Sequence, residues 1–346
     1  MINKILTMWK EAISTEGYSI YIHYPFCGNK CKYCVYTGNL IDDSYAQKYK
    51  EYTQIYLPKA INRYKDIFTS KVAENLYFGG GTPNLLKPDD MVRILESIPN
   101  FYNIKNKIID LHPLYLTDKK IETIIKLGFT TVCIGVQSFN DYTLNINNRK
   151  NPSLYKIKDI VNRFNDAGVY TSIDLMTYIS QYNTSDINIL KNDLDIATTL
   201  NLDFIDINPN LHLVLKDPKY GDTFEKATDS FIKKYYKNYI SEKDVSGYNS
   251  LNDRWIYRII KKDSKDKFYS EILPYYADDF PYAKNNIIGI GDLNNGHSTM
   301  SYIHGRLFYV EKNINNEPTY DVRFIKEEKN THLKALNNML SKYSLS

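Results

Sequence analysis

The sequence predicts an α/β protein in which parallel β-strands are covered by helices. Over roughly the first 208 residues, six strand-like segments alternate with helix-like segments, a pattern typical of a parallel sheet. The chain has 346 residues, of which 43% are hydrophobic and 24% charged, enough for a substantial core. Right-handed crossovers between the strands would wind them into a barrel or part of one.

Each element has its own local pattern. Apolar runs predict strands at residues 18–24, 74–78, 107–111, 130–136, 169–175 and 204–207. Helical segments are predicted at 43–67, with Pro58 as a kink, and at 88–98, 118–127, 154–167 and 187–200. Two of these helices end at a glycine, Gly128 and Gly168, which is a common helix terminator.

The alternation stops after Pro209, so the chain divides into residues 1–208 and 209–346. The second part mixes helical stretches at 223–240 and 331–342 with strands at 306–311 and 319–325. A glycine-rich segment, IIGIGDLNNGHS, precedes these two strands. We therefore expect a core domain followed by a short α+β extension.

Charge and hydropathy exclude several function classes. The 44 Lys and Arg residues exceed the 40 Asp and Glu by only four and are spread along the chain, so no nucleic-acid partner is expected. No segment approaches the ~18 apolar residues of a membrane span, and the N-terminus lacks the apolar core of a signal peptide. We expect a cytoplasmic protein with no membrane partner.

Polar and glycine residues follow the predicted strands where a parallel α/β fold binds its ligands. In chain order these are the cysteines Cys27, Cys31 and Cys34, the segment Gly79-Gly80-Gly81-Thr82-Pro83, Asp110, Gln137 with Ser138, Asp174 and Asn208, with Arg149 in a connection. Read singly, each carboxylate is more often a solvated strand end, and the glycine run a plain turn. Together they predict a ligand site at one rim.

Three of the four cysteines lie within eight residues, spaced C-x3-C-x2-C. In a reducing compartment this crowding indicates metal or redox chemistry rather than disulfides. Three thiolates can hold three irons of a [4Fe–4S] cluster and leave the fourth iron open. Structural zinc with His23 as fourth ligand is the alternative, although His23 lies among bulky strand residues. Cys133, in an apolar run, is expected to be buried.

These motifs resemble those of radical S-adenosylmethionine (SAM) enzymes. The segment from Tyr21 to Cys27, with Cys31, Tyr33 and Cys34, is similar to the cluster motif of the oxygen-independent coproporphyrinogen III oxidase-like branch. That branch includes haem chaperone-like proteins and class C radical methyltransferases. Further matches follow in order, at FGGGTP, the IDLHP stretch with Asp110, GVQSF, Leu144 and Arg149, and SIDLM with Asp174.

The resemblance implies a partial (β/α)6 barrel that holds a [4Fe–4S] cluster and SAM. By this resemblance Cys27, Cys31 and Cys34 are the metal ligands, Gly80 and Asp110 bind the first SAM, and Tyr21 packs beside the cluster. It also implies a second SAM, for which the matching residues are Tyr33, Gly81, Thr82, Gln137, Arg149, Asp174 and Asn208. An electron donor such as flavodoxin or ferredoxin and a small-molecule substrate are the implied partners.

The chain departs from the branch at three places along the core, and too few residues follow the glycine-rich segment for the usual terminal helical domain that helps cover the substrate. Asp110 replaces a glutamate, residues 177–181 read TYISQ in place of a Gly-Leu-Pro-Gly segment, and Tyr36 stands where a Cys-x-Cys would place a cysteine. We therefore expect a substrate other than a porphyrin, with radical methyl or methylene transfer as the most specific version. Coproporphyrinogen decarboxylation, haem trafficking without turnover and a zinc-stabilised barrel are the alternatives. His212, His297 and His304 have no assigned role.

Overall fold

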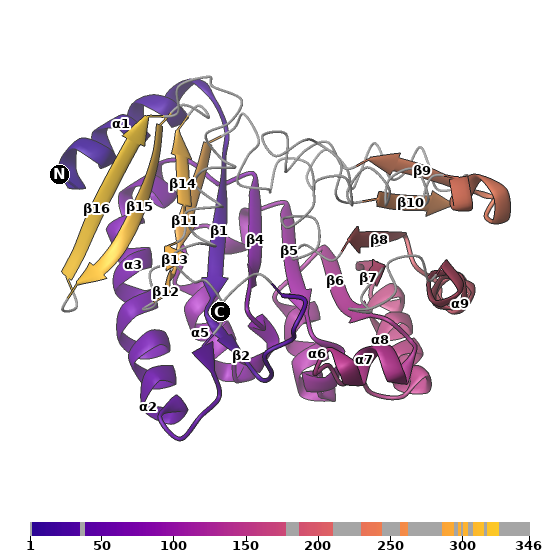
Figure 1. Cartoon of the computed structure of the whole chain (residues 1–346). Helices are drawn as coiled ribbons and strands as arrows, with labels where there is room; N and C mark the ends of the chain where they lie inside the picture. The colour runs from indigo at the N-terminus through magenta and orange to yellow at the C-terminus, as the bar shows by residue number, and fades with distance from the viewer. Residues whose placement is uncertain are drawn as a thin grey trace.

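Six parallel strands form the centre of the sheet in the computed structural model (Figure 1). The structure describes residues 2–34, 39–177, 187–209, 230–243, 257–261, 286–293, 297–298, 300–303, 307–314 and 317–324. The six strands pair in chain order and are β1 (Tyr18–Tyr24), β4 (Asn75–Gly80), β5 (Asn106–Leu111), β6 (Thr131–Gln137), β7 (Tyr170–Thr177) and β8 (Phe204–Pro209). The predicted α/β class and its six strands are confirmed.

Strands from the second half of the chain extend the same sheet at both ends. Beyond β1 lie β11 (Asn286–Ile290), which is parallel to it, and the antiparallel β14 (Met300–Ile303), β15 (Leu307–Ile314) and β16 (Glu317–Phe324). Beyond β8 lie the antiparallel β10 (Tyr257–Lys261) and β9 (Tyr239–Lys243). A small pair, β12 (Asp292–Leu293) and β13 (His297–Ser298), forms a separate two-stranded sheet. After β8 the pairing thus changes from parallel to mainly antiparallel.

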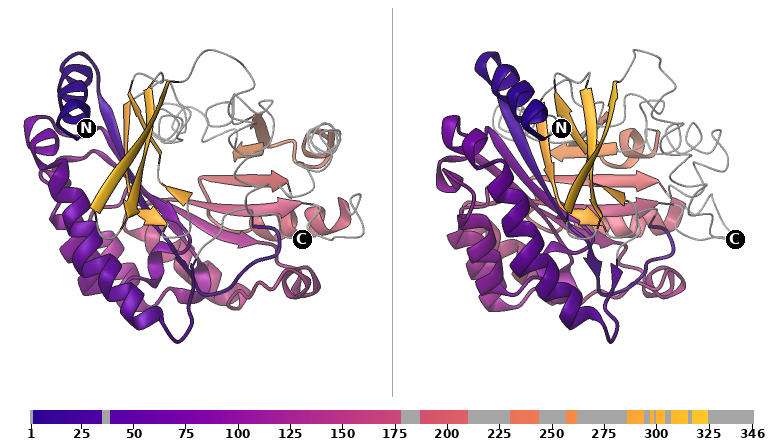
Figure 2. Two further views of the ribbon diagram at one scale, coloured as in Figure 1. Left: turned by 60° about the vertical axis from the view of Figure 1, so that its left-hand side comes forward. Right: turned by 90° about the vertical axis from the view of Figure 1, so that its left-hand side faces the viewer.

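Helices cover the outer face of the curved sheet (Figure 2). They include α5 (Pro88–Glu96), α6 (Asp118–Lys126), α8 (Leu154–Asp166) and α9 (Ile187–Ala197). Side chains of Thr117 and Ser153 cap the first turns of α6 and α8, and left-handed Gly128 and Gly168 follow their last turns. These local signals explain why the helix boundaries were predictable.

The long predicted helix at 43–67 is interrupted. It consists of α2 (Tyr45–Lys50), a π-helical turn (Glu51–Tyr56), α3 (Leu57–Arg63) and α4 (Lys65–Ser70). Pro58 lies at the start of α3, directly after the π-helical turn, where its missing N–H interrupts the regular ladder. Two further helices, α1 (Ile2–Thr15) and α7 (Asp141–Ile146), were not predicted.

The predictions for the extension are partly corrected. The predicted helix at 223–240 is helical at residues 230–235, but β9 begins at Tyr239, so its predicted end is wrong. The two predicted strands correspond to the longer β15 and β16. The predicted helix at 331–342, His212 and His304 lie outside the described residues. None of the helices described is long and apolar enough to cross a membrane.

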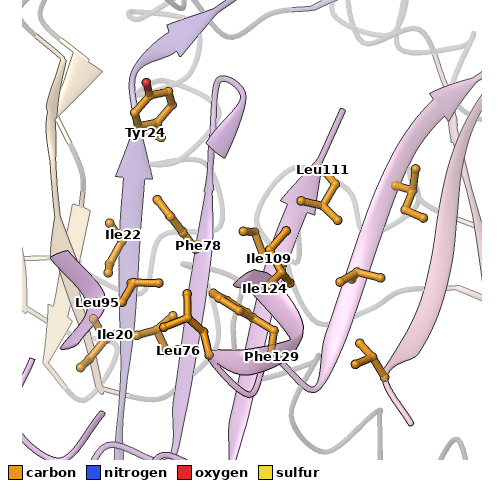
Figure 3. Packing of buried hydrophobic residues seen from close by; sticks show 14 of the residues in the cluster. Ile20, Ile22, Tyr24, Leu76, Phe78, Leu95, Ile109, Leu111, Ile124 and Phe129 are labelled. Carbon is orange, nitrogen blue, oxygen red and sulfur yellow. The ribbon is translucent and has the colours of Figure 1, made fainter. Parts of the chain in front are cut away.

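The two faces of the central sheet differ because side chains alternate along each strand. Residues such as Ile20, Leu76 and Ile109 point outward and pack against α5 and α6 (Figure 3). The opposite, inner face carries a separate cluster of Tyr77, Ile108, Cys133, Phe204 and Ile260. Cys133 is buried, as expected, but it belongs to this inner face. Towards the carboxyl ends of the strands, the inner face becomes polar.

Candidate functional site

The three clustered cysteines lie on a loop that hydrogen bonds hold at its base and midway along its length. Short strands β2 (Phe26–Cys27) and β3 (Asn39–Leu40) pair in parallel across its base. Farther along, Lys32 N donates to Asn147 O at 3.1 Å and Asn148 Nδ2 donates to Lys30 O at 3.0 Å. These last two contacts hold the loop against the segment that follows α7, which contains Arg149.

The loop presents three thiols, and none of them forms a disulfide. Cys31 packs with Tyr33 and Met176 of β7, and Cys34 contacts the same group. Burial raises the pKa of the Cys27 thiol to about 11, while a hydrogen bond with Thr82 and the charge of Arg149 act in the opposite direction. Such a thiol becomes a thiolate when a cation takes the place of the proton.

The glycine run after β4 packs directly onto this loop. A Cβ on Gly81 would lie 2.5 Å from Phe26 O and 2.8 Å from Cys27 Sγ. A Cβ on Gly80, whose φ is +110°, would lie 2.6 Å from Tyr24 O. No larger residue fits at these two positions without moving the cysteine loop or the end of β1. The run is therefore more than a plain turn.

Arg149 connects the cysteine loop to the end of β6. Its side chain is 7% exposed, its Nη1 lies 3.9 Å from Cys31 Sγ, and its Nη2 donates to Gly135 O. Gln137 lies two residues beyond Gly135, at a register shift between β6 and β7, with a left-handed φ of 73°. A Cβ on Gly135 would lie 3.1 Å from Gln137 Nε2 and 3.4 Å from Arg149 Nη2. The two side chains therefore approach each other over Gly135.

The unusual backbone at Gln137 is held from two sides. Asp193 of α9 accepts from Ser138 Oγ and from Phe139 N, both at 2.7 Å. Asn151 Nδ2 donates to Val136 O at 2.7 Å. A strained residue that its surroundings fix so firmly is typical of a functional site.

Asp110 lies on the inner face and is joined to a row of aromatic side chains. Tyr77 OH donates to Asp110 Oδ1 at 2.6 Å, the rings of Tyr77 and Tyr21 lie 5.8 Å apart, and Tyr21 OH is 3.0 Å from His23 Nδ1. Burial raises the pKa of Asp110 to about 7, although the bond from Tyr77 opposes this. At neutral pH this carboxyl group can therefore hold or release a proton.

Asp174 stands next to a buried ion pair that the sequence did not predict. It is paired in register with Asp206 of β8, which Arg258 of β10 binds through two hydrogen bonds of 2.8 and 2.9 Å. Burial raises the pKa of Asp174 well above its usual value, Asp206 and Asp110 add to the rise, and Arg258 and Arg149 oppose it. Asn208, also predicted, lies in register with Met176 at the end of β8.

The donor set fits a cluster better than a zinc ion. Within the described ranges, no three His, Cys, Asp or Glu side chains converge on a point that could hold one metal ion. A [4Fe–4S] cluster does not need such convergence, because each thiolate binds a different iron. The glycine contact with Cys27 also suits a site built around a bound group, as does the Nε of buried Arg149, which has no partner among the residues that the structure describes.

Sequence reasoning missed four residues of this rim. His112 lies two residues after Asp110 on the same face, so the strand period would have indicated it. Tyr115 is near the thiols, since a Cβ on Gly28 would collide with its hydroxyl. Tyr77 follows from the same period, but Arg258 carries no local signal because only long-range pairing brings β10 to β8.

Comparison with known proteins identifies the family. The family model of the radical SAM superfamily matches residues 21–194, which is half of the chain. This chain belongs to the radical SAM superfamily. Members of this superfamily use a [4Fe–4S] cluster and SAM.

Curated relatives support the narrower resemblance. The heme chaperone HemW of Buchnera aphidicola is 28% identical over 68% of this chain and 63% of its own length. The oxygen-independent coproporphyrinogen III oxidase of Helicobacter pylori J99 is 30% identical over 35% of this chain and 27% of its own. The chain thus spans less than two thirds of the length of these relatives.

The fold is shared with a solved member of the same branch. Coproporphyrinogen III oxidase (HemN) from Escherichia coli superposes with a TM-score of 0.67 at 17% identity, covering 97% of this chain and 81% of that one. At this identity the likeness shows the fold alone. The expectation of a radical SAM fold is confirmed.

Proposed function

We propose that this chain is a radical SAM enzyme that modifies a small molecule other than a porphyrin. In this proposal Cys27, Cys31 and Cys34 bind three irons of a [4Fe–4S] cluster and leave one iron open to SAM. Reductive cleavage of SAM there would supply a 5′-deoxyadenosyl radical to take hydrogen from the substrate. Support comes from three thiols, none of them in a disulfide, on one anchored loop in a superfamily member.

The first SAM would lie between the glycine run and the inner face. Backbone carbonyls near Gly80 would receive its ammonium group, and Asp110 would bind an amino or hydroxyl donor. A positive charge beside Asp110 would lower the pKa of this carboxyl from about 7 and hold it ionised. Tyr21 would pack at the side of the cluster.

The position of Arg149 is the observation that supports a second SAM molecule in the proposal. Its guanidinium lies between Cys31 and Gly135, beside Gln137, and a planar fork suits a carboxylate. Asp174 would hold the ribose hydroxyls of this molecule. The remaining contacts proposed for it are Tyr33, Gly81, Thr82 and Asn208. A second SAM beside the first would supply the group for radical methyl or methylene transfer.

The C-terminal part would cover the substrate. Its strands β10 and β11 flank the six central strands, and Arg258 of β10 reaches the inner face next to Asp174. In the proposal residues 209–346 are this covering part, and residues 1–208 are the catalytic core. An external one-electron donor, such as flavodoxin or ferredoxin, completes the reaction because the cleavage of SAM consumes an electron.

The cluster is tested first, with anaerobically reconstituted protein. About four iron and four sulfide per chain are expected, since three thiolates and one open iron describe a [4Fe–4S] cluster. Cys31→Ala should lose the iron, and Cys133→Ala, altered on the inner face away from the loop, should keep it. Loss of iron in the Cys133 variant alone would overturn the assignment of the ligands.

The second SAM is tested with the reaction products. With dithionite, SAM and substrate, a methyltransferase should release S-adenosylhomocysteine together with 5′-deoxyadenosine. Arg149→Ala should weaken the binding of the second SAM by about 10- to 100-fold, the range for loss of a hydrogen bond to a charged group. Arg163→Ala, which removes a half-buried arginine paired to Asp118 on the outer helices, serves as the matched control. Release of 5′-deoxyadenosine and methionine only would leave a radical oxidoreductase.

Two other functions have specific support. The relative that carries the name heme chaperone, HemW, aligns with 68% of this chain, so non-catalytic haem trafficking is one alternative. Stable haem binding without 5′-deoxyadenosine formation would select it. Decarboxylation of coproporphyrinogen III is the other, supported by the relatives that carry this oxidase name. Release of carbon dioxide from coproporphyrinogen III would select it.

A further inference from the structure

Two buried N–H donors near the cysteine loop have no hydrogen-bond acceptor among the described residues. They are Arg149 Nε and His112 Nε2, and both side chains are 7% exposed. The His112 tautomer follows from its other nitrogen, because Nδ1 accepts from Leu114 N at 3.2 Å. The ring proton therefore lies on Nε2, and the unsatisfied atom is a donor.

The His112 ring is held firmly in place. Its backbone N donates to Asn84 Oδ1 and its carbonyl accepts from Asn84 Nδ2, both at 2.9 Å, and Asn84 is fully buried. On the other side the ring lies against Tyr115, with centroids 4.7 Å apart. A donor that is fixed and buried in this way costs stability unless an acceptor reaches it.

His112 and Arg149 both lie beside the cysteine loop. The Tyr115 ring that packs on His112 has its hydroxyl against Gly28, and Arg149 Nη1 lies 3.9 Å from Cys31 Sγ. Burial lowers the pKa of His112 to about 2, and the positive charge of Arg149 lowers it further, so the ring is neutral at physiological pH. Burial raises the pKa of Tyr115; the charge of Arg149 lowers it, while Cys31 and Cys27 raise it. Among the described residues, Arg149 is the cation whose charge lowers the pKa of the His112 ring. One positive charge with two donors matches a monoanion with two oxygens.

We propose that His112 Nε2 and Arg149 Nε together bind the carboxylate of the second SAM molecule. The inference rests on the proposed function and adds to it a residue to which the motifs assigned no role. Arg149 contributes the charge, and His112 contributes a neutral donor whose orientation Asn84 and Leu114 fix. A phosphate, with about two negative charges, would leave one charge uncompensated in a buried site.

The test compares two ligands that differ only in the carboxylate. Binding of S-adenosylhomocysteine and of its decarboxylated analogue to the reconstituted protein is measured by calorimetry, and the site lost in Arg149→Ala is followed. His112→Asn is the decisive variant, because the asparagine side chain can still accept from Leu114 N but cannot reach as far as Nε2. This variant should weaken the binding of S-adenosylhomocysteine by about 10- to 100-fold and leave the binding of the decarboxylated analogue unchanged.

Thr143→Val is the matched control. Thr143 is also buried, and its Oγ1 also has no partner in the described structure, but it lies on α7 and is assigned no ligand. The control should bind both ligands as the wild type does. Equal weakening of both ligands in His112→Asn, or no change in either, would overturn the inference.

The outcomes separate this inference from the proposed function. If Arg149→Ala loses the preference for the carboxylate and His112→Asn keeps it, the role of His112 is wrong and the second SAM stands. If the wild type binds both ligands equally, the proposal of a second SAM site is itself wrong. His112→Gln, whose longer amide restores a distal donor, should recover part of the preference.

Discussion

Replacing Arg258 by methionine should destabilise the protein strongly. Arg258 is 2% exposed and Asp206 is 3% exposed, and the two form a bidentate ion pair across β8 and β10. The substitution keeps most of the aliphatic volume, and the new methionine side chain would still pack against Phe204, over which the guanidinium now lies at 4.9 Å. What the substitution removes is the cation that pairs with Asp206.

The magnitude follows from the two hydrogen bonds and the buried charge. Breaking a buried pair from one side costs about 3–5 kcal/mol, because the other charge stays in the interior without compensation. The carboxyl group can instead take a proton, which costs an ordinary aspartate about 4 kcal/mol at neutral pH and limits the loss. The substitution would also raise the pKa of Asp174, next to Asp206 on the sheet, because the positive charge of Arg258 now opposes the rise in that pKa.

The assay is urea unfolding followed by circular dichroism at neutral pH, with the free energy of unfolding extrapolated to water. The double variant Asp206→Asn/Arg258→Met should lose less than the sum of the two single variants, because it leaves no charge buried alone. The deficit of Arg258→Met should shrink in acid, where aspartate is protonated in both the folded and unfolded states.

A surface ion pair provides the control. Lys119 Nζ lies 3.2 Å from Asp89 Oδ1, but both side chains are exposed, so Lys119→Met should change the free energy of unfolding by less than about 1 kcal/mol. If Arg258→Met is no more destabilising than Lys119→Met, the buried pair is not formed as described, and its electrostatic effect on Asp174 is lost with it.

Three further predictions concern the rim of the sheet. Gly81→Ala should lower the iron content, because its new Cβ would meet Cys27 Sγ at 2.8 Å, whereas Gly168→Ala, with no atom within 4 Å, should keep the iron; equal iron in both would refute the steric argument. Asp110→Asn should gain stability relative to the wild type as pH rises from about 4 to about 7, because Asp110, with its pKa raised to about 7, stays protonated when folded but ionises when unfolded. A flat difference across this range in urea unfolding would contradict that pKa. Gln137→Gly should weaken SAM binding in calorimetry without lowering the melting temperature, because glycine adopts the φ of 73° without strain; a clear drop in melting temperature would show that the side chain stabilises the fold.

The order of the elements and the type of fold were readable from local patterns. Glycines such as Gly128 and Gly168 end helices because a left-handed residue must follow the last turn, and this need is local. The cysteine spacing and the glycine run were equally local. The interrupted helix before Pro58 was only partly predicted, because a π-helical turn depends on packing as well as on the proline.

The extension was less predictable. Tyr239 was placed at the end of a helix, yet it begins β9, which pairs with β10 in the same sheet. Strand formation there depends on a partner that lies well along the chain, so local propensity could not decide it. The position of Arg258 was unpredictable for the same reason, since it lies beside Asp206 only because β10 pairs with β8.

The sequence by itself determined which chemical groups are available and the order in which they follow the strands. The cysteines, glycines and carboxylates follow strand ends, and because parallel strands all finish at one edge, the sequence placed these groups at one rim; Arg149 comes in the connection after β6. Only the tertiary structure decided which of them meet. The contact of Arg149 with Cys31 joins residues 118 positions apart, and the ion pair of Arg258 with Asp206 joins residues 52 positions apart. The His112 donor is left without a partner among the described residues only because the fold buries it. Such contacts arise from the curvature of the sheet and the pairing of its strands, which no local pattern encodes.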